Sequence, residues 1–326
     1  MSTSNPEEKA IIIGISGPSS SGKTTLARLL QRIFCGVNLQ KSTNENSLNT
    51  FIIHEDDFYF SDDKIPYTTT PSGTKIQDWD TPSALDLPFL SQSLHYVRQN
   101  GRLPPRLQSK EDQNSATESG VPDETVAELR DLVEHRLEVN IIGNNIVEKQ
   151  KPAPTLAFLE GFLLFAPPND ANHVLREVHD AIHLPLFLPA PYGAVKERRE
   201  GRTGYVTVGP AVEPPKEESK VNVHSGVGVD LEGEGEREAQ NFWVDPPGYV
   251  DDVVWPRYVR DHAWLLVPEG GVEGVDEAEL VRRVGEGTRV RRDVGVEVAP
   301  GDGRAGMDVV LRWAVEVILG YYIERM

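Results

Sequence analysis

The chain has 326 residues, of which 38% are hydrophobic, and it carries a formal net charge of −18 at pH 7. This acidic balance argues against a protein that binds nucleic acid or an anionic membrane surface, because both need a basic face. The single cysteine, Cys35, excludes a disulfide framework within the chain and a cysteine-based metal site. The polar segment 1–10 has no signal-peptide pattern, so we expect a soluble protein of the cytoplasm, with the nucleus as a second compartment.

Predicted strands alternate with predicted helices along the chain. Short runs of β-branched or apolar residues predict strands at 10–15, 51–54, 155–159 and 182–188, with a weaker one at 264–267. Apolar residues at helical spacing predict helices at 24–34, 83–97, 126–137 and 309–322. The alternation predicts one α/β domain that spans residues 1–326, with a parallel sheet covered by helices on both faces.

Two polar stretches interrupt this pattern. Residues 104–125 are rich in Gln, Ser, Glu and Pro, and residues 206–240 hold eight acidic side chains against three basic ones. Neither has the apolar content that offsets the entropy of ordering, so we predict two mobile insertions within the single domain. The glycines and charges of residues 270–303 predict a loosely packed region before the last helix.

A phosphate-binding motif follows the first predicted strand. Residues 17–24 are GPSSSGKT, which matches the P-loop pattern GxxxxGK[ST] and opens the first predicted helix. In such a loop the backbone N–H groups and the helix N-terminus bind phosphate, the lysine reaches the β- and γ-phosphates, and the Thr hydroxyl binds Mg²⁺. We therefore predict that ATP and Mg²⁺ are bound here, by Gly17, Ser19, Ser20, Ser21, Gly22, Lys23, Thr24 and Thr25. The sequence lacks the guanine-specifying NKxD of a GTPase and a second ATPase module, so a phosphotransferase is favoured over a GTPase or a motor.

Carboxylates lie at the ends of two other predicted strands, where ligands bind in open α/β sheets. HEDDFY, residues 54–59, ends the second strand, and its Asp56 could accept a proton from an attacking hydroxyl or bind Mg²⁺. A solvated acidic turn is an equally good explanation of this position. Glu160 ends the strand 155–159 and has apolar neighbours on both sides, which favours a Walker B carboxylate for Mg²⁺ over a charge facing solvent.

A basic cluster follows the strand 182–188. Arg198, Arg199 and Arg202 stand close together in an otherwise acidic chain. Arginines of this kind stabilise the charge of a transferred phosphoryl group, although a solvated basic helix face is the competing interpretation.

A tryptophan between two carboxylates is the last candidate. Trp79 lies between Asp78 and Asp80 in a polar stretch. The face of a Trp ring beside carboxylates suits a flat, cationic ligand ring, although packing is the commoner role of a Trp.

Six segments together resemble the nicotinamide riboside kinases, especially the fungal ones, within the uridine kinase-like group. They are IIIGISGPSSSGKTTLA, HEDDFY, IQDWDTPSALD, FLEGFLLF, KERREGRTGY and FWVDPPGYVDDVVWPRYVRDH. The resemblance implies a nucleoside kinase-like P-loop fold with a lid. It also implies ATP-dependent phosphorylation of the ribose 5′-hydroxyl of nicotinamide riboside in NAD salvage, with nicotinic acid riboside as a further acceptor to be tested. The partner of the chain would then be a small molecule, with no role for nucleic acid or a membrane.

The resemblance also implies roles for the matched side chains. Asp56 would be the general base near Mg²⁺, and Trp79 and Tyr205 would hold the nicotinamide ring. Asp80 would accept a hydrogen bond from a ribose hydroxyl, and the arginine cluster would close as a lid. The implied catalytic residues are Lys23, Asp56, Arg198 and Arg199. The implied substrate-binding residues are Asp56, Asp57, Phe58, Tyr59, Trp79, Asp80, Arg199 and Tyr205. ATP would also contact Arg198 and Arg202, and the metal ligands would be Thr24, Asp56 and Glu160.

Two other functions stay open at this point. A uridine or cytidine kinase would share the P-loop, but it should bind the base edge with hydrogen-bonding side chains, whereas Trp79 offers a stacking surface. A nucleotide-binding regulator without transfer activity need not keep the catalytic residues together.

The chain departs from the family in one segment. About 35 residues, 206–240, lie where the family passes quickly from the lid tyrosine to the DPP segment, and we expect this insertion to bulge from the domain.

Overall fold

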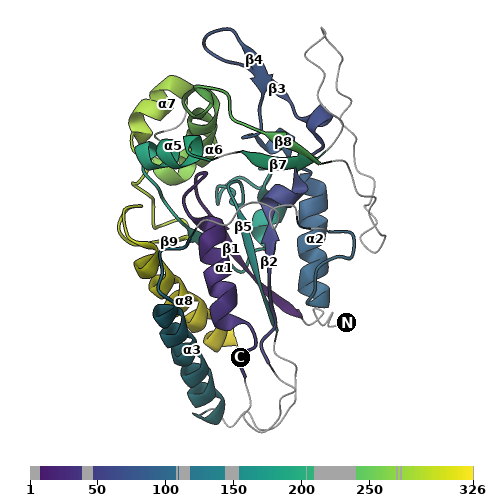
Figure 1. Ribbon diagram of the computed structural model, residues 1–326, viewed down its shortest axis with the longest axis vertical. Helices are drawn as coiled ribbons and strands as arrows, with labels where there is room; N and C mark the ends of the chain where they lie inside the picture. Colours follow the sequence, from purple (N-terminus) through teal and green to yellow (C-terminus); the bar gives the residue numbers. More distant parts are fainter. Residues whose placement is uncertain are drawn as a thin grey trace.

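The computed structural model describes residues 8–38, 47–107, 109, 118–143, 154–202, 204–208, 240–268, 271 and 274–325. Its centre is a parallel sheet of five strands in the order β2-β5-β1-β6-β9 (Figure 1). These strands are β1 (Ala10–Ser16), β2 (Thr50–His54), β5 (Thr155–Gly161), β6 (Leu184–Phe187) and β9 (Glu297–Val298). The strands predicted at 10–15, 51–54, 155–159 and 182–188 are therefore confirmed, and β9 is a further strand that the pattern did not predict.

Helices cover both faces of the sheet, as predicted (Figure 1). One face packs against α1 (Lys23–Phe34), α3 (Asp123–Gly143) and α8 (Met307–Arg325). The other packs against α2 (Leu87–Asn100), α4 (Arg176–Ala181), α6 (Trp255–Leu266) and α7 (Glu277–Val284). Alternation along β1 supplies both cores, because Ile11, Ile13 and Ile15 join the first core whereas Ala10 and Ile12 join the second. Within the described residues, no helix is both long enough and apolar enough to cross a lipid bilayer.

Two small hairpins and one helix lie beyond the carboxyl ends of the central strands, and we call them the cap (Figure 1). They are β3 (Tyr67–Thr69) with β4 (Lys75–Gln77), β7 (Tyr205–Val208) with β8 (Gln240–Trp243), and α5 (Tyr192–Glu200). Asp62 holds the second hairpin to the domain, because its Oδ2 accepts hydrogen bonds from Thr207 Oγ1 (3.0 Å) and Asn241 Nδ2 (2.8 Å). The cap thus stands over the end of the sheet at which the P-loop lies.

Two predictions for the C-terminal third need correction. The strand predicted at 264–267 is wrong, because this run closes the helix α6 and buries its apolar side chains in the core. A short apolar run looks alike in a buried helix and in a buried strand. The region 270–303, predicted to be loosely packed, contains α7 and β9 among its described residues, so it extends the sheet and covers one face.

Both predicted insertions lie partly outside the described residues. In the first, 104–125, residues 108 and 110–117 are outside, and the helix α3 already begins at Asp123. In the second, 206–240, residues 209–239 are outside, while the residues that flank them pair as β7 and β8. The second insertion therefore begins and ends within a hairpin of the cap.

Candidate active site

The P-loop curls between β1 and α1 with little room for side chains. Gly17 has a φ of 155°, and a Cβ at this position would lie 2.3 Å from the carbonyl oxygen of Leu188, so a larger residue does not fit. Ser20 and Gly22 also have positive φ values, of 59° and 97°. Positive φ values within such a turn direct successive N–H groups to one side, which is how anion-binding nests form.

Three polar side chains of the P-loop fit a phosphate ligand. Among the described residues, the buried hydroxyl groups of Ser20 and Ser21 have no hydrogen-bond partner. Lys23 is buried, and its Nζ donates to the carbonyl oxygen of Pro18 at 3.0 Å. Burial lowers the pKa of the Lys23 ammonium, although neighbouring carboxylates oppose the shift. Two hydroxyls and an ammonium at the N-terminus of α1 are the donors that a nucleoside triphosphate needs.

Glu160, near the end of β5, is joined to the P-loop helix and to β2. Its Oε1 accepts a hydrogen bond from Thr24 Oγ1 at 3.0 Å and lies 2.7 Å from Nδ1 of His54. Burial alone would raise the pKa of Glu160, but the His54 contact and the charge of Lys23 outweigh it, so the pKa lies below its usual value. The described residues contain no cluster of three or more metal-ligating side chains. A hydroxyl and a carboxylate are, however, a suitable pair for Mg²⁺, which takes its other ligands from phosphates and water.

Asp56 lies in the turn η1 (Glu55–Phe58), which a neighbouring carboxyl group anchors to the segment that follows β5. Oε2 of Glu55 accepts hydrogen bonds from the backbone N–H groups of Phe162 (2.7 Å) and Leu163 (3.0 Å). Glu55 is fully buried, and burial raises its pKa to about 8. A Cβ at Gly161 would lie 2.4 Å from Glu55, so glycine allows this close approach. The anchored turn sets Asp56 in the wall of a cavity beside the P-loop.

This cavity has a volume of about 80 Å³ and joins the P-loop to the cap. Ser19 of the P-loop and Asp56 both line it. The cap and the segments next to it supply Trp79, Asp80, Arg199, Arg202, Tyr205 and Trp243. The structure therefore gathers most of the side chains that the resemblance assigned to substrate binding, although they come from segments far apart in the chain.

The aromatic side chains of the cavity pack against one another. The ring centroid of Trp79 lies 5.4 Å from that of Tyr59, edge to face, and 5.6 Å from that of Trp243. Tyr59 in turn stacks on Phe162 at 6.4 Å. Trp79 is only 6% exposed, so the tryptophan found in a polar stretch of sequence is both a packed residue and a wall of the cavity.

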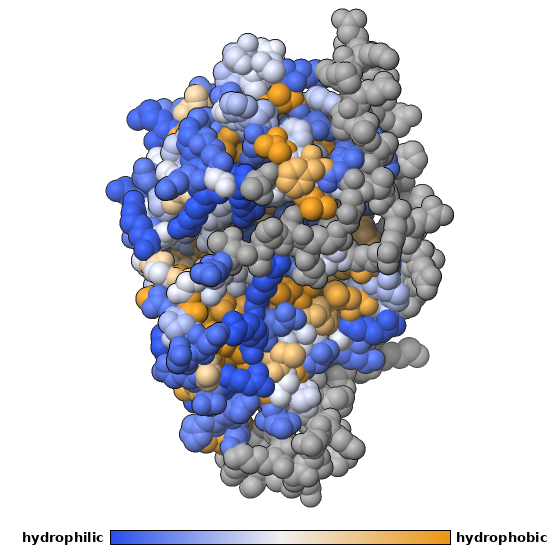
Figure 2. Space-filling model, in the orientation of Figure 1, coloured by the Kyte–Doolittle hydropathy of each residue, from blue (hydrophilic) through white to orange (hydrophobic). Residues whose placement is uncertain are grey.

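The hairpin β7–β8 has an inner and an outer face. Alternate residues of β8 point to opposite sides: Trp243 lines the cavity and Asn241 bonds to Asp62, while Phe242 between them is 59% exposed. Figure 2 shows apolar atoms gathered on the surface over this hairpin. The inner face therefore belongs to the site and the outer face does not.

Arg199 is buried inside the cap between two carboxylates. Its Nη atoms donate to both carboxylate oxygens of Asp80 (2.9 and 3.0 Å), and its Nε donates to Asp245 at 2.7 Å. The guanidinium also lies over the rings of Tyr205 (5.4 Å) and Tyr249 (5.7 Å). Burial raises the pKa of Asp80, and the guanidinium offsets part of this rise. In this structure Arg199 shapes the cavity through Asp80 and does not reach the P-loop.

The other two predicted lid arginines lie nearer to the nucleotide side. Nη1 of Arg198 donates to the backbone oxygen of Ser20 in the P-loop at 3.2 Å. Arg202 lines the cavity, and its guanidinium lies 5.3 Å from the ring centre of Tyr205. The cluster predicted to act as one lid is thus divided among the P-loop, the cavity and the buried carboxylates.

Known proteins with similar sequences identify the family. The sequence model of the Phosphoribulokinase / Uridine kinase family matches residues 12–132. The nicotinamide riboside kinase of Schizosaccharomyces pombe is 33% identical over 271 residues, which cover 82% of this chain and 84% of that protein. The chain belongs to the nicotinamide riboside kinase family. The nicotinamide riboside kinases of Saccharomyces cerevisiae and Eremothecium gossypii are 27% and 26% identical, over 86% and 78% of this chain and 88% and 77% of their own lengths.

Membership of the nicotinamide riboside kinase family confirms the resemblance seen in the sequence. The chain is a P-loop kinase that takes ATP as phosphoryl donor and an alcohol as acceptor. Two residues that the resemblance implied for substrate binding lie away from the cavity in this family member. Phe58 is buried in the core, 5.1 Å from the ring of Phe89, and Asp57 is absent from the cavity wall. Thr25 lies in the first turn of α1, next to Thr24.

Several residues of the kinase site received no role from the sequence, although each lies in a matched segment. They are His54 and Glu55 in HEDDFY, Phe162 in FLEGFLLF, and Trp243 and Asp245 in FWVDPP. The sequence therefore indicated that these segments belong to the site. It did not indicate the role of each side chain, because a role depends on the contacts that the side chain makes in the fold.

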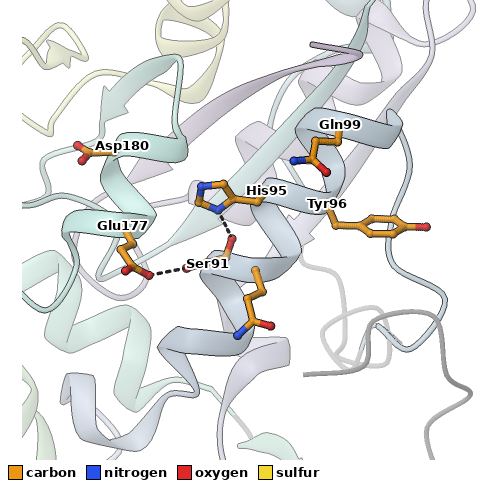
Figure 3. A pocket seen from close by; sticks show the side chains of 7 residues that line it. Ser91, His95, Tyr96, Gln99, Glu177 and Asp180 are labelled. Carbon is orange, nitrogen blue, oxygen red and sulfur yellow. Dashed lines mark hydrogen bonds between the residues drawn. The ribbon is translucent and has the colours of Figure 1, made fainter. Parts of the chain in front are cut away.

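A larger depression of about 540 Å³ lies between α2 and α4, apart from the kinase site (Figure 3). Its wall contains Ser91 and His95 of α2 and Glu177 of α4. Ser91 Oγ donates to Glu177 Oε2 at 2.9 Å, and His95 Nδ1 lies 2.8 Å from the carbonyl oxygen of Ser91, so these polar groups are bonded within the wall. No residue of the P-loop lines this depression. The smaller cavity is therefore the candidate active site.

Proposed function

We propose that this kinase transfers the γ-phosphoryl group of ATP to the 5′-hydroxyl of nicotinamide riboside, which forms nicotinamide mononucleotide for NAD salvage. One observation carries the proposal: a single cavity is lined by Ser19 of the P-loop, by Asp56 and by the rings of Trp79 and Tyr205. A phosphoryl donor, a proton acceptor and an aromatic surface thus adjoin the same space. The names of the relatives, all nicotinamide riboside kinases, support the choice of acceptor.

The cavity suits a flat, positively charged ring. Aromatic faces attract cations, and the pyridinium ring of nicotinamide riboside is a cation. The carboxylates of Asp56 and Asp80 line the cavity together with the guanidinium groups of Arg199 and Arg202. The aromatic faces of Trp79 and Tyr205 are therefore the feature that favours a cationic base over the neutral base of uridine or cytidine.

Asp56 and the P-loop divide the chemistry of transfer. Asp56 takes the proton of the ribose hydroxyl as the oxygen attacks. Lys23 and the P-loop N–H groups hold the phosphates in line with that hydroxyl, and positioning and electrostatics supply most of the rate. Arg198, which is bonded to the P-loop at Ser20, and the nearby Arg202 add positive charge where negative charge develops.

Thr24 and Glu160 would hold Mg²⁺, with Asp56 close by. Their oxygens already lie 3.0 Å apart, and Glu160 is ionised because its pKa is lowered. The metal, when bound, neutralises charge on the β- and γ-phosphates.

The cavity must widen to admit the substrate. Its volume is about 80 Å³, whereas ligand pockets typically measure roughly 300 Å³ or more. Asp56 and the P-loop are tied to the sheet, whereas the hairpin β7–β8 belongs to the cap and Arg202 follows the cap helix α5. Binding of the riboside therefore displaces the cap, and its closure afterwards excludes water from the transfer.

The decisive experiment is coupled ADP release by the purified protein with ATP and Mg²⁺. Nicotinamide riboside, nicotinic acid riboside, uridine and cytidine are offered separately at equal concentration. We expect strong turnover with nicotinamide riboside and weak turnover with both pyrimidine nucleosides. Turnover with uridine or cytidine alone would overturn the proposed substrate. Absence of ADP release with all four acceptors would favour a nucleotide-binding regulator.

A further inference from the structure

His54 and Glu160 form a buried contact at the end of the sheet that carries the P-loop. They lie opposite each other in the parallel register of β2 and β5. The two residues are 2% and 4% exposed, and Nδ1 of His54 lies 2.7 Å from Oε1 of Glu160. Thr24 Oγ1 donates to the same oxygen at 3.0 Å. Side chains from β2 and α1 therefore converge on one carboxylate oxygen of β5.

The two hydrogen bonds restrict the direction of the Glu160 side chain. An ionised carboxylate is only an acceptor, so His54 donates to Glu160 from Nδ1–H. Without such donors the side chain of Glu160 would regain rotamer freedom. The hydroxyl of Thr24 can continue to donate to Glu160 while its oxygen lone pair binds a cation. His54 completes this arrangement from β2.

We propose that His54 is a positioning residue that holds Glu160 in the orientation needed for Mg²⁺, so that the metal meets the Thr24 hydroxyl and the Glu160 carboxylate together. This inference rests on the Mg²⁺-dependent part of the proposed function and is independent of the nucleoside. Donors that orient a metal ligand in this way typically matter roughly 10- to 100-fold in metal affinity or activity. The competing role of His54 is a purely structural link between β2 and β5.

Two substitutions separate these roles. The amide nitrogen of Asn takes about the place of the histidine Nδ1, so His54→Asn keeps the donor toward Glu160. The amide nitrogen of Gln reaches the place of Nε2 instead, so His54→Gln removes that donor. A matched control is His183→Asn, because Nε2 of His183 lies 2.8 Å from Oε2 of Glu8 in another histidine–glutamate contact, next to Ile12 on β1 and away from the P-loop.

The first readout is the increase in melting temperature (the thermal shift) that ADP produces, measured once with Mg²⁺ and once with a chelator. This measurement requires neither phosphoryl transfer nor a nucleoside acceptor. We expect His54→Gln to lose most of the Mg²⁺-dependent part of the shift and to keep the part that ADP produces alone. His54→Asn and His183→Asn should keep both parts. The second readout is the Mg²⁺ concentration that gives half-maximal kinase activity, which should rise roughly 10- to 100-fold in His54→Gln alone.

Either of two results would overturn the proposal. One is an equal Mg²⁺ requirement in His54→Asn and His54→Gln, and the other is an equal loss of the shift with and without Mg²⁺. Because His54 is buried, His54→Ser is the second variant: it removes the imidazole without added bulk, and the same results are expected as for His54→Gln. If nicotinamide riboside proves not to be the acceptor, the thermal shifts are unaffected, so failure of the proposed function is distinguishable from failure of this inference.

Discussion

The phosphate end and the nucleoside end of the site are built in different ways. The P-loop is one continuous segment, 17–24, that uses backbone N–H groups, set by the φ values of Gly17 and Gly22, and the side chain of Lys23. The adjoining cavity is assembled from side chains of distant segments, so that Trp79 and Trp243 meet at 5.6 Å. A site contained in one segment is visible as a spacing of residues, whereas a site made by tertiary contacts depends on the packing of the whole cap.

This difference predicts how substitutions behave at the two ends. Near the P-loop, a change should affect the chemical step or the nucleotide and leave the fold intact. In the cap, the same side chains bind substrate and hold the structure together, so a change should affect stability and the KM of the riboside.

Asp56→Asn should give the largest effect on catalysis. The substitution removes the proposed base but keeps the size of the side chain, so we expect kcat to fall roughly 10²- to 10⁴-fold with little change in the KM of ATP. The coupled ADP-release assay measures both. Asp63→Asn, at an exposed carboxylate in the turn η2 (Asp62–Lys64), is the control and should be close to wild type. Normal turnover by Asp56→Asn would show that Asp56 is not the base.

Arg199→Ala should give the largest effect on stability. It leaves the buried carboxylates of Asp80 and Asp245 without their shared cation, and loss of one partner from a buried ion pair typically costs about 3–5 kcal/mol. Urea unfolding measures the free energy. The control is Arg282→Ala, since Arg282 is 74% exposed and pairs with Glu279 at 2.7 Å on the surface. Surface pairs contribute about 0–1 kcal/mol, so a similar small cost at Arg199 would contradict its role in the cap.

Glu55→Gln tests the turn that connects the two ends. Burial raises the pKa of Glu55 from 4.5 to about 8, so between these values the folded protein keeps a proton that the unfolded chain has lost. The unfolded state then binds fewer protons, and the stability of the wild type falls as pH rises through this window. Gln cannot titrate, and its oxygen can still accept from the N–H groups of Phe162 and Leu163. We expect the wild type to lose stability relative to Glu55→Gln by up to about 1.4 kcal/mol per pH unit, a few kcal/mol in all.

Urea unfolding at several pH values from about 5 to 8 measures this difference. Parallel stability curves for the wild type and Glu55→Gln would show that Glu55 is ionised in the folded protein at neutral pH.

The sequence predicted the sheet and the P-loop well because both depend on local patterns. The run 10–15 is β-branched and continuous, so it predicts a buried strand, whereas β9 (Glu297–Val298) is too short to leave a pattern. The resemblance treated Arg198 and Arg199 as one lid. Successive residues of a helix point about 100° apart, so the two side chains of α5 reach different partners, Ser20 and Asp80. Spacing alone could have predicted that they diverge, but not what each one meets.

Substitutions of Trp243 should have the smallest effects, and they test whether the nucleoside end of the site acts independently of the phosphate end. Its ring lines the cavity, and its Nε1 donates to Asp245 at 2.9 Å. We expect Trp243→Ala to raise the KM of nicotinamide riboside about tenfold, since an aromatic contact contributes about 0.5–1.5 kcal/mol beyond its buried area. Trp243→Phe keeps a ring and loses only the hydrogen bond, so it should raise the KM about threefold.

The neighbour on β8 provides the control for Trp243. Phe242 points outward and is 59% exposed, so Phe242→Ala should change neither KM. The KM of ATP should also stay constant in both Trp243 variants, because the aromatic partners of this ring are Trp79 and Tyr249. If the KM of ATP rose as much as that of the riboside, the cap would have to close before either substrate is held. The two ends would then be a single cooperative unit, despite their different construction.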